Sequence, residues 1–255
     1  KGNIPEATKY YQQIINQGYN DYRVFSNYGV ILNNLGKSKE AQTLFRKAIE
    51  LKPDFEVSNL NLGNLLRDQG KLGEAEFFTR KAIELKPDYA DAYNNLGNTL
   101  RDLDRLEEAE KSIKMAINID SKSAIFYSNL GNILKDRGEF NEAAKYYKKA
   151  INLNENLPKA KEGLISCKSL ICDWSEDEIQ KNWLKTLGIE GEPVLTLGLI
   201  CIEDDPIKQL KRSINFYKKK YPKEIKTIKK IRTKKIHLGY FSADFRSHAT
   251  TYLIS

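Results

Sequence analysis

The chain has 255 residues, of which 40% are hydrophobic and 30% charged, a composition that excludes a wholly disordered protein. Its 42 Lys and Arg outnumber 34 Asp and Glu, which gives a formal net charge of +8. The sequence contains no apolar run long enough to span a bilayer, so a membrane protein is excluded. The three cysteines form no CxxC pair and no even set, which excludes a disulfide-stapled secreted protein. Because no apolar signal segment follows Lys1, we predict a cytoplasmic protein.

Small residues recur along the first 157 residues with a period of 34. One row is glycine, at Gly29, Gly63, Gly97 and Gly131, and two rows are alanine, at Ala41, Ala75, Ala109 and Ala143 and at Ala48, Ala82, Ala116 and Ala150. This period and pattern resemble the tetratricopeptide repeat, in which each unit is a pair of antiparallel helices. We therefore predict four units, at 22–55, 56–89, 90–123 and 124–157.

The units are expected to stack, because a single helix pair cannot bury its apolar face alone. The sequence thus predicts a mostly α protein whose main part is an α-solenoid. A glycine follows each first helix in three units, at Gly36, Gly70 and Gly138, and predicts a left-handed helix cap there. Asp104 takes that position in the third unit.

Residues 1–21 match a turn and the second helix of a further unit, with Gly2, Ala7 and Tyr11 in register. The first helix of that unit is not present in the sequence. Since natural arrays end in a polar capping helix, we expect these residues to be part of a longer array and to expose apolar surface.

Asparagine forms two more rows inside the predicted first helices, although it is a mediocre helix former. The rows are Asn27, Asn61, Asn95 and Asn129, and Asn64, Asn98 and Asn132. Each amide carries a donor and an acceptor, so such a ladder could pair with the backbone of an extended peptide on the concave face. The alternative is structural, with each amide bonded to a neighbouring helix.

Residues 158–234 are predicted to contain a capping helix and a helical basic linker. A helix is expected over 158–175, starting at Pro158, and another over 176–192 that stops near Gly188. The apolar run 193–202 is ambiguous by periodicity. Asp205 and Pro206 then predict a helix start, with the helix continuing to about Tyr221.

The positive charge is local, because Lys208 to Lys235 contains 13 Lys and Arg and a single acid, Glu224. A nucleic-acid interface would require interleaved aromatic residues and a folded module to present them, and neither is visible. We interpret this stretch as a solvated helix face and a linker, with binding of phosphate or an anionic partner as the alternative, and expect neither nucleic acid nor membrane as a partner.

Residues 235–242 alternate as a strand does, and a polar loop and a possible helix start at Thr250 follow. This order is typical of the first unit of an open α/β sheet, whose ligands bind at the carboxyl end of the strand.

Three signatures coincide: asparagine-bearing repeats, Cys172-Asp173-Trp174 after the last repeat helix, and KIHLGYFSADFRSHATTYL from Lys235 to Leu253. Together they resemble the family of the protein O-linked N-acetylglucosamine transferases and their SPINDLY-like relatives. The resemblance implies that 235–255 begins a GT-B catalytic lobe, which uses UDP-N-acetylglucosamine as donor to modify Ser or Thr of extended protein acceptors. It places His248 at the active site as a candidate general base, a role that suits an imidazole near neutral pKa.

The chain departs from the family pattern at Ala249 and Tyr252, where proline and a second histidine are common. No residue corresponds to a nucleotide contact, so we expect this segment alone to bind no cofactor or metal and to be inactive. Two other functions stay open: a repeat scaffold for protein interactions without catalysis, and a protein O-fucosyltransferase that uses GDP-fucose.

Overall fold

A computed structural model describes residues 4–173, 184–194 and 205–220. It divides the chain into two compact units, Lys1–Phe216 and Tyr217–Ser255. The predictions for Trp174, the strand at 235–242, the GT-B lobe and His248 lie outside the described residues, as does most of the apolar run 193–202.

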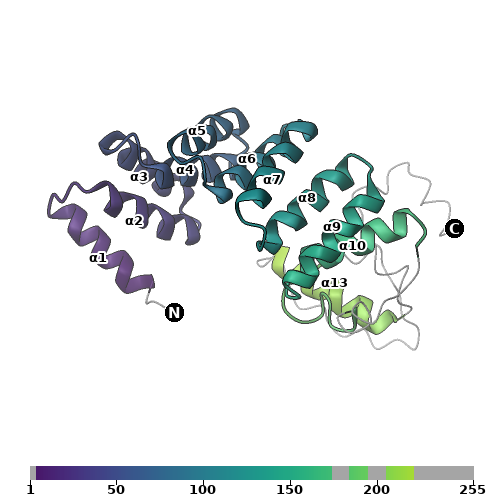
Figure 1. The fold of residues 1–255 in the computed structure, drawn as a ribbon. Coiled ribbons are helices and arrows are strands. Elements are labelled where there is room, and N and C mark those ends of the chain that lie inside the picture. The colour runs from purple at the N-terminus through teal and green to yellow at the C-terminus, as the bar shows by residue number, and fades with distance from the viewer. Residues whose placement is uncertain (1–3, 174–183, 195–204, 221–255) are drawn as a thin grey trace, which may run out of the picture. The chain divides into compact units, whose positions relative to one another are not determined.

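The described residues form an all-helical fold (Figure 1). The helices are α1 (Ile4–Asn16), α2 (Tyr22–Asn34), α3 (Ser38–Leu51), α4 (Glu56–Asp68), α5 (Leu72–Leu85), α6 (Ala90–Asp102), α7 (Leu106–Ile119), α8 (Ala124–Asp136), α9 (Phe140–Leu153), α10 (Pro158–Leu170) and α13 (Pro206–Lys220). In this part of the chain no strand is present, and the only strand-like pairing is an isolated bridge between Leu187 and Glu190.

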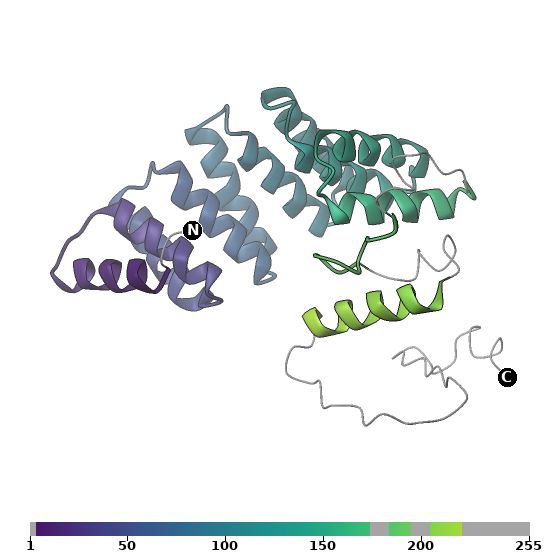
Figure 2. The same ribbon diagram turned by 90° about the horizontal axis from the view of Figure 1, so that it is seen from below.

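Helices α2 to α9 form four antiparallel pairs that follow one another along the chain (Figure 2). The first helices α2, α4, α6 and α8 each have 13 residues, and successive ones start 34 residues apart. Helix α10 continues this phase and therefore stands where the first helix of a fifth unit would be. Each first helix also contacts the next first helix, whereas successive second helices make at most marginal contact. The first helices therefore lie on the inner side of the stack.

The close approach within each pair depends on the glycine row. A Cβ added to Gly97 would lie 2.6 Å from the side chain of Ile113 and 3.1 Å from the carbonyl oxygen of Ala109. The other three glycines meet the equivalent residue of their own second helix in the same way: Gly29 meets Phe45, Gly63 meets Thr79, and Gly131 meets Tyr147. The alanine rows are buried beside these contacts, so the small residues set the spacing between the helices.

The predicted left-handed caps are confirmed. Gly36, Gly70 and Gly138 have φ between 75° and 82°, and Asp104 adopts the same conformation with φ 59°. The equivalent residue after α10 is Cys172, with φ 53°. The predicted helix over 158–175 is therefore too long, because the chain turns at this cap and α10 ends at Leu170.

Residues 184–194 form turns rather than the end of the helix predicted to reach Gly188. The chain leaves the helical conformation after Leu184, and Gly188 has φ 71°, a value that ends a helix. Helix α13 lies on this segment through Arg212, which is fully buried and donates from Nε to the Leu187 carbonyl (2.8 Å) and from Nη2 to the Leu184 carbonyl (2.8 Å). The predicted helix start at Pro206 is confirmed, and Asp205 accepts hydrogen bonds from the first-turn amides of Ile207 and Lys208.

We expect Gly97→Ala to lower the free energy of unfolding by about 1–3 kcal/mol, because the new methyl group overlaps Ile113 and the Ala109 carbonyl. Gly73→Ala in α5 is the matched control, since its Cβ would meet no atom within 4 Å. It should raise stability by about 0.5–1 kcal/mol. Urea titration followed by circular dichroism measures both, and equal effects would contradict the steric account.

We expect Cys172→Gly to raise stability by about 0.5 kcal/mol, because glycine adopts the left-handed conformation without steric cost but also gains freedom in the unfolded chain. Gly70→Ala should lower stability by about 1 kcal/mol at the equivalent cap. Thermal unfolding of the two variants beside the parent chain measures these shifts, and a stabilised Gly70→Ala variant would disprove the cap assignment.

Candidate functional site

The seven asparagines predicted to form a ladder all lie on the first helices. Six are half-buried, at Asn61, Asn64, Asn95, Asn98, Asn129 and Asn132, and Asn27 is exposed. The Nδ2 group of Asn129 in α8 donates to Oδ1 of Asn94 in α6, at 2.8 Å. This bond crosses between successive first helices, so the asparagine row follows the inner side of the stack.

Two of these amides take part in a chain of hydrogen bonds. Asn94 is buried and accepts from Asn129, while its own Nδ2 donates to Oδ1 of Asn95 at 3.3 Å. This is the structural alternative that the sequence left open, and it holds for Asn129, whereas the bond of Asn95 stays within its own helix α6. The chain of bonds ties the third unit to the fourth.

A third amide is also engaged within the fold. The hydroxyl of Tyr147 donates to Oδ1 of Asn132 at 2.7 Å. The Tyr147 ring is fully buried between Gly131 and Gly163, where added Cβ atoms would lie 2.9 Å and 2.4 Å from ring carbons. Burial raises the pKa of Tyr147 well above its usual range, so the hydroxyl stays protonated and remains a donor.

Four amides have no hydrogen-bond partner within the part of the chain that the structure describes: Asn27, Asn61, Asn64 and Asn98. Asn61 and Asn64 are three residues apart on α4 and so lie on the same side of that helix. Asn98 is the equivalent of Asn64 on α6. These half-buried amides are the part of the predicted ladder that has no hydrogen bond to any described residue.

Ion pairs join the same first helices near their C-terminal ends. Arg101 donates to Asp136 at 2.5 Å, and Arg67 lies 3.7 Å from Asp102. Both pairs connect one first helix to the next in the same register, from α6 to α8 and from α4 to α6. Because each cation has an acidic partner, this edge of the inner surface carries little net charge.

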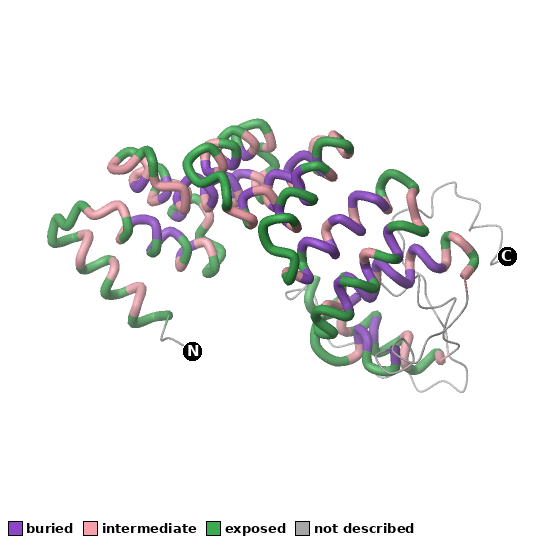
Figure 3. Tube along the Cα trace, in the orientation of Figure 1, coloured by how far each residue is buried: buried purple, intermediate pink, exposed green. Residues whose placement is uncertain are grey.

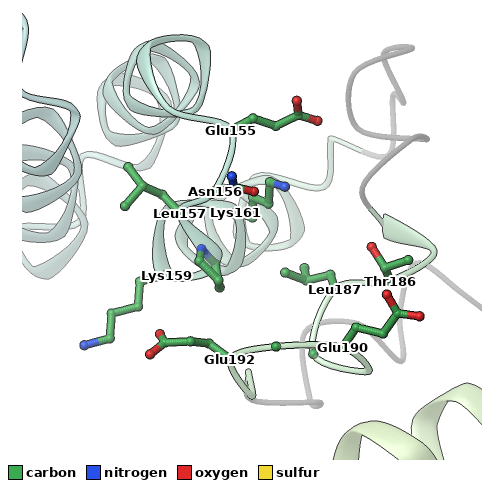
Figure 4. A pocket seen from close by; sticks show the side chains of 12 residues that line it. Glu155, Asn156, Leu157, Lys159, Lys161, Thr186, Leu187, Glu190 and Glu192 are labelled. Atoms are coloured by element: carbon green, nitrogen blue, oxygen red, sulfur yellow. The ribbon is translucent and has the colours of Figure 1, made fainter. Parts of the chain in front are cut away.

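A separate pocket of about 490 Å³ lies where α10 meets residues 184–194 (Figure 4). Its charged lining is mixed: Glu155, Lys159 and Lys161 come from the start of α10 and the residues before it, and Glu190 and Glu192 come from the other segment. Burial lowers the pKa of Lys161, and the nearby Glu155 opposes this shift. None of the residues predicted to bind peptide lines this pocket, so it is distinct from the asparagine row.

Nothing in the described ranges indicates a metal or membrane site. No cluster of three or more metal-ligating side chains is present there, and no helix there is long and apolar enough to cross a bilayer. Cys167 is buried, and its burial raises the thiol pKa to about 11, so it is protonated at neutral pH and unsuited to nucleophilic chemistry.

Two residues that shape this surface were not singled out in the sequence. Asn94 bridges two units at a position where the other units have Ser26, Leu60 and Ser128. Tyr147 occupies the position of Phe45 in the first unit and adds a hydroxyl. Aligning the four units shows both, because asparagine stands at the first position only in the third unit and tyrosine stands at the second position only in the fourth unit.

Comparison with known proteins agrees with the fold. Residues 22–55, 57–89 and 88–156 match models described as tetratricopeptide repeat. The chain therefore carries tetratricopeptide repeats over residues 22–156, and its helical stack has the architecture of that class of repeat protein.

Several solved structures are similar to the chain. MamA from Desulfovibrio magneticus RS-1, solved from residue 41 to its end, has a TM-score of 0.55 at 23% identity, and the match covers 60% of this chain and 87% of that solved chain. PilF of Pseudomonas aeruginosa has a TM-score of 0.61 at 19% identity, and the match covers 86% of this chain and 94% of the PilF chain. YrrB, described as a TPR protein with an unusual peptide-binding site, has a TM-score of 0.53 at 17% identity. The match covers 80% of this chain and 97% of the YrrB chain. At these identities the likeness shows a common fold, and no curated protein matches the chain.

We expect Asn132→Ala to destabilise the chain by about 1–3 kcal/mol, because it leaves the buried Tyr147 hydroxyl without its acceptor. Tyr147→Phe removes the hydroxyl itself and should cost less, about 1 kcal/mol. Chemical denaturation of the two variants and of the double variant tests this order. A double variant less stable than Asn132→Ala alone would contradict it.

Proposed function

We propose that the repeat stack is a protein-interaction scaffold that binds an extended segment of another polypeptide along its inner side. The observation that carries this proposal is the set of half-buried amides at Asn61, Asn64 and Asn98, which have no hydrogen-bond partner among the described residues. These amides reach solvent, where water is their partner, and the backbone of a bound chain can replace that water with direct hydrogen bonds.

An extended peptide backbone is the ligand that suits these groups. It presents a donor and an acceptor at each residue, and an amide side chain can satisfy one of each. Because such bonds do not involve the peptide's side chains, selectivity for sequence should be low. The near-neutral ion pairs on the same side add no strong preference for a charged ligand. The fold shared with YrrB supports binding of this kind.

We expect the triple variant Asn61→Ala, Asn64→Ala, Asn98→Ala to bind peptides at least about tenfold more weakly than the parent chain. The probe is an immobilised array of unstructured peptides of varied sequence. Stability should stay the same or rise slightly, because alanine is the better helix former and no internal bond is lost.

The matched control replaces three exposed asparagines on second helices, Asn118, Asn141 and Asn152, with alanine. This variant removes the same groups from the outer side and should bind as the parent does. An equal loss of peptide binding in both variants, or no loss of binding in the Asn61, Asn64 and Asn98 variant, would refute the site on the inner side.

A second function is supported by the sequence alone. Cys172-Asp173-Trp174 and the stretch 235–253 resemble protein O-glycosyltransferases, so we propose that the scaffold delivers Ser or Thr of its bound segment to a site that contains His248. There His248 would take the proton of the hydroxyl as its oxygen bonds to the anomeric carbon of N-acetylglucosamine, whose bond to the diphosphate breaks and releases UDP. GDP-fucose is the alternative donor.

The test is to incubate the protein, expressed from its complete reading frame, with each donor and a Ser/Thr peptide pool. Intact peptide masses are then compared with those from His248→Ala. A hexosamine adduct that His248→Ala abolishes would support the transferase, and a fucose adduct would change the donor. Absence of any adduct with peptide binding retained would leave the scaffold function alone.

A further inference from the structure

The row of ion pairs between successive first helices ends at α8. Arg101 of α6 pairs with Asp136 of α8. One unit later the equivalent residues are Lys135 of α8 and Leu170 of α10. Leucine has no acceptor, and the Lys135 side chain makes no ion pair or hydrogen bond with any described residue. The pattern that neutralises the preceding cations of this row therefore fails at Lys135.

The surroundings of Lys135 do not compensate its charge. The ammonium group lies close enough to Cys167 of α10 to affect its pKa, but burial is the larger effect and raises the thiol pKa to about 11. The thiol is therefore uncharged at neutral pH and offers no counter-ion. Glu162, the acidic residue of α10, forms no ion pair with Lys135 either. A half-buried cation is thus left without an anion among the described residues.

Two further hydrogen-bond donors lie on the same side of these helices. Asn132 is three residues before Lys135 on α8, so the two side chains are neighbours. Its Oδ1 accepts from the Tyr147 hydroxyl at 2.7 Å, and its Nδ2 has no partner among the described residues. Ser166 of α10 stands one repeat after Asn132, and its hydroxyl also has no partner there.

These donors lie where the stack is partly open. Helices α8 and α10 are in contact and mostly buried, and each ends in an exposed residue (Figure 3). Asn132, Lys135 and Ser166 are all half-buried. We call these three residues the donor site.

A carboxylate is the group that the donor site suits. Its two oxygens only accept hydrogen bonds, and bonds from an ammonium group to a carboxylate are stronger than those between neutral groups. Upstream, Arg67 and Arg101 are each paired with an aspartate, so the amides of α4 and α6 face a neutral backbone without competition for charge. A preference for an anion is therefore confined to the α8 and α10 end of the inner side.

We propose that the donor site binds the side-chain carboxylate of an aspartate or glutamate in the segment held along the inner side of the stack. This inference rests on the proposed scaffold function and adds the kind of segment that is held: one with an acidic residue where it passes from α8 to α10. Because α10 continues the phase of the first helices, a bound chain can run on past this point, which favours a side chain over a chain end.

The probe is a set of unstructured peptide pairs whose members differ only by Glu or Gln at one central position, all with amidated C-termini. We expect the full chain to bind the Glu member at least about fivefold more tightly. Because backbone contacts are independent of peptide sequence, each peptide can slide until its acidic residue reaches the donor site. Fluorescence anisotropy of labelled peptides gives the ratio of the two affinities.

Lys135→Gln should remove this preference for Glu, and Ser166→Ala should reduce it by about twofold. The matched control is Lys111→Gln, which makes the same change of charge at an exposed position of α7 and should keep the preference. The triple variant of Asn61, Asn64 and Asn98 should weaken binding of both members of a pair and leave their ratio unchanged.

The outcomes separate this inference from the function on which it rests. If the parent chain bound none of the peptides, the scaffold function would fail and this inference with it. Equal binding of the Glu and Gln members by the parent chain, or the same ratio in Lys135→Gln as in Lys111→Gln, would overturn the donor site alone. A preference for free over amidated C-termini that Lys135→Gln removes would overturn the side-chain assignment and give the site to a chain end.

Discussion

The approach of two helix backbones at Gly29, Gly63, Gly97 and Gly131 is the constraint on which the rest of the structure depends. Each glycine faces a buried side chain of its own second helix, at a separation that leaves no room for a Cβ. Because the same contact recurs every 34 residues, successive pairs stack in one phase. Residues that share a position in the repeat therefore lie on the same side of the stack. Asparagines at one repeat position, one from each unit, thus form a row along that side.

The members of that row differ in their hydrogen bonding. Asn129 and Asn132 bond within the fold and help to hold α8 against its neighbours. Asn61, Asn64 and Asn98 have no such bonds to any described residue and remain available on α4 and α6. Under the proposed function, the second and third units are therefore where the fold would compete least with a bound chain for these amides.

The sequence was sufficient to predict the repeat, the phase of its helices and its caps, because these depend on residue types that recur: glycine at the crossings and at the turns. It was insufficient where a single residue or contact decides where a helix ends or whether a side chain is hydrogen-bonded. Helix α10 ends at Leu170 because Cys172 adopts the left-handed cap, which its residue type does not indicate. Likewise, the difference between Asn132 and Asn98 is set by the residue at 147, where tyrosine reaches an amide and isoleucine at 113 does not.

The residues opposite the glycines also bear on how such an array avoids mistakes during folding. Near-identical units invite exchange of partners, and misassembly between neighbours is a known failure of repeat proteins. Here the opposing side chains are Phe45, Thr79, Ile113 and Tyr147, four different volumes against four glycines in closely fitted surroundings. A second helix paired one unit out of register would bring either a void or a clash at the glycine. Variation at this one position therefore makes each second helix fit its own first helix better than it fits the first helix of another unit.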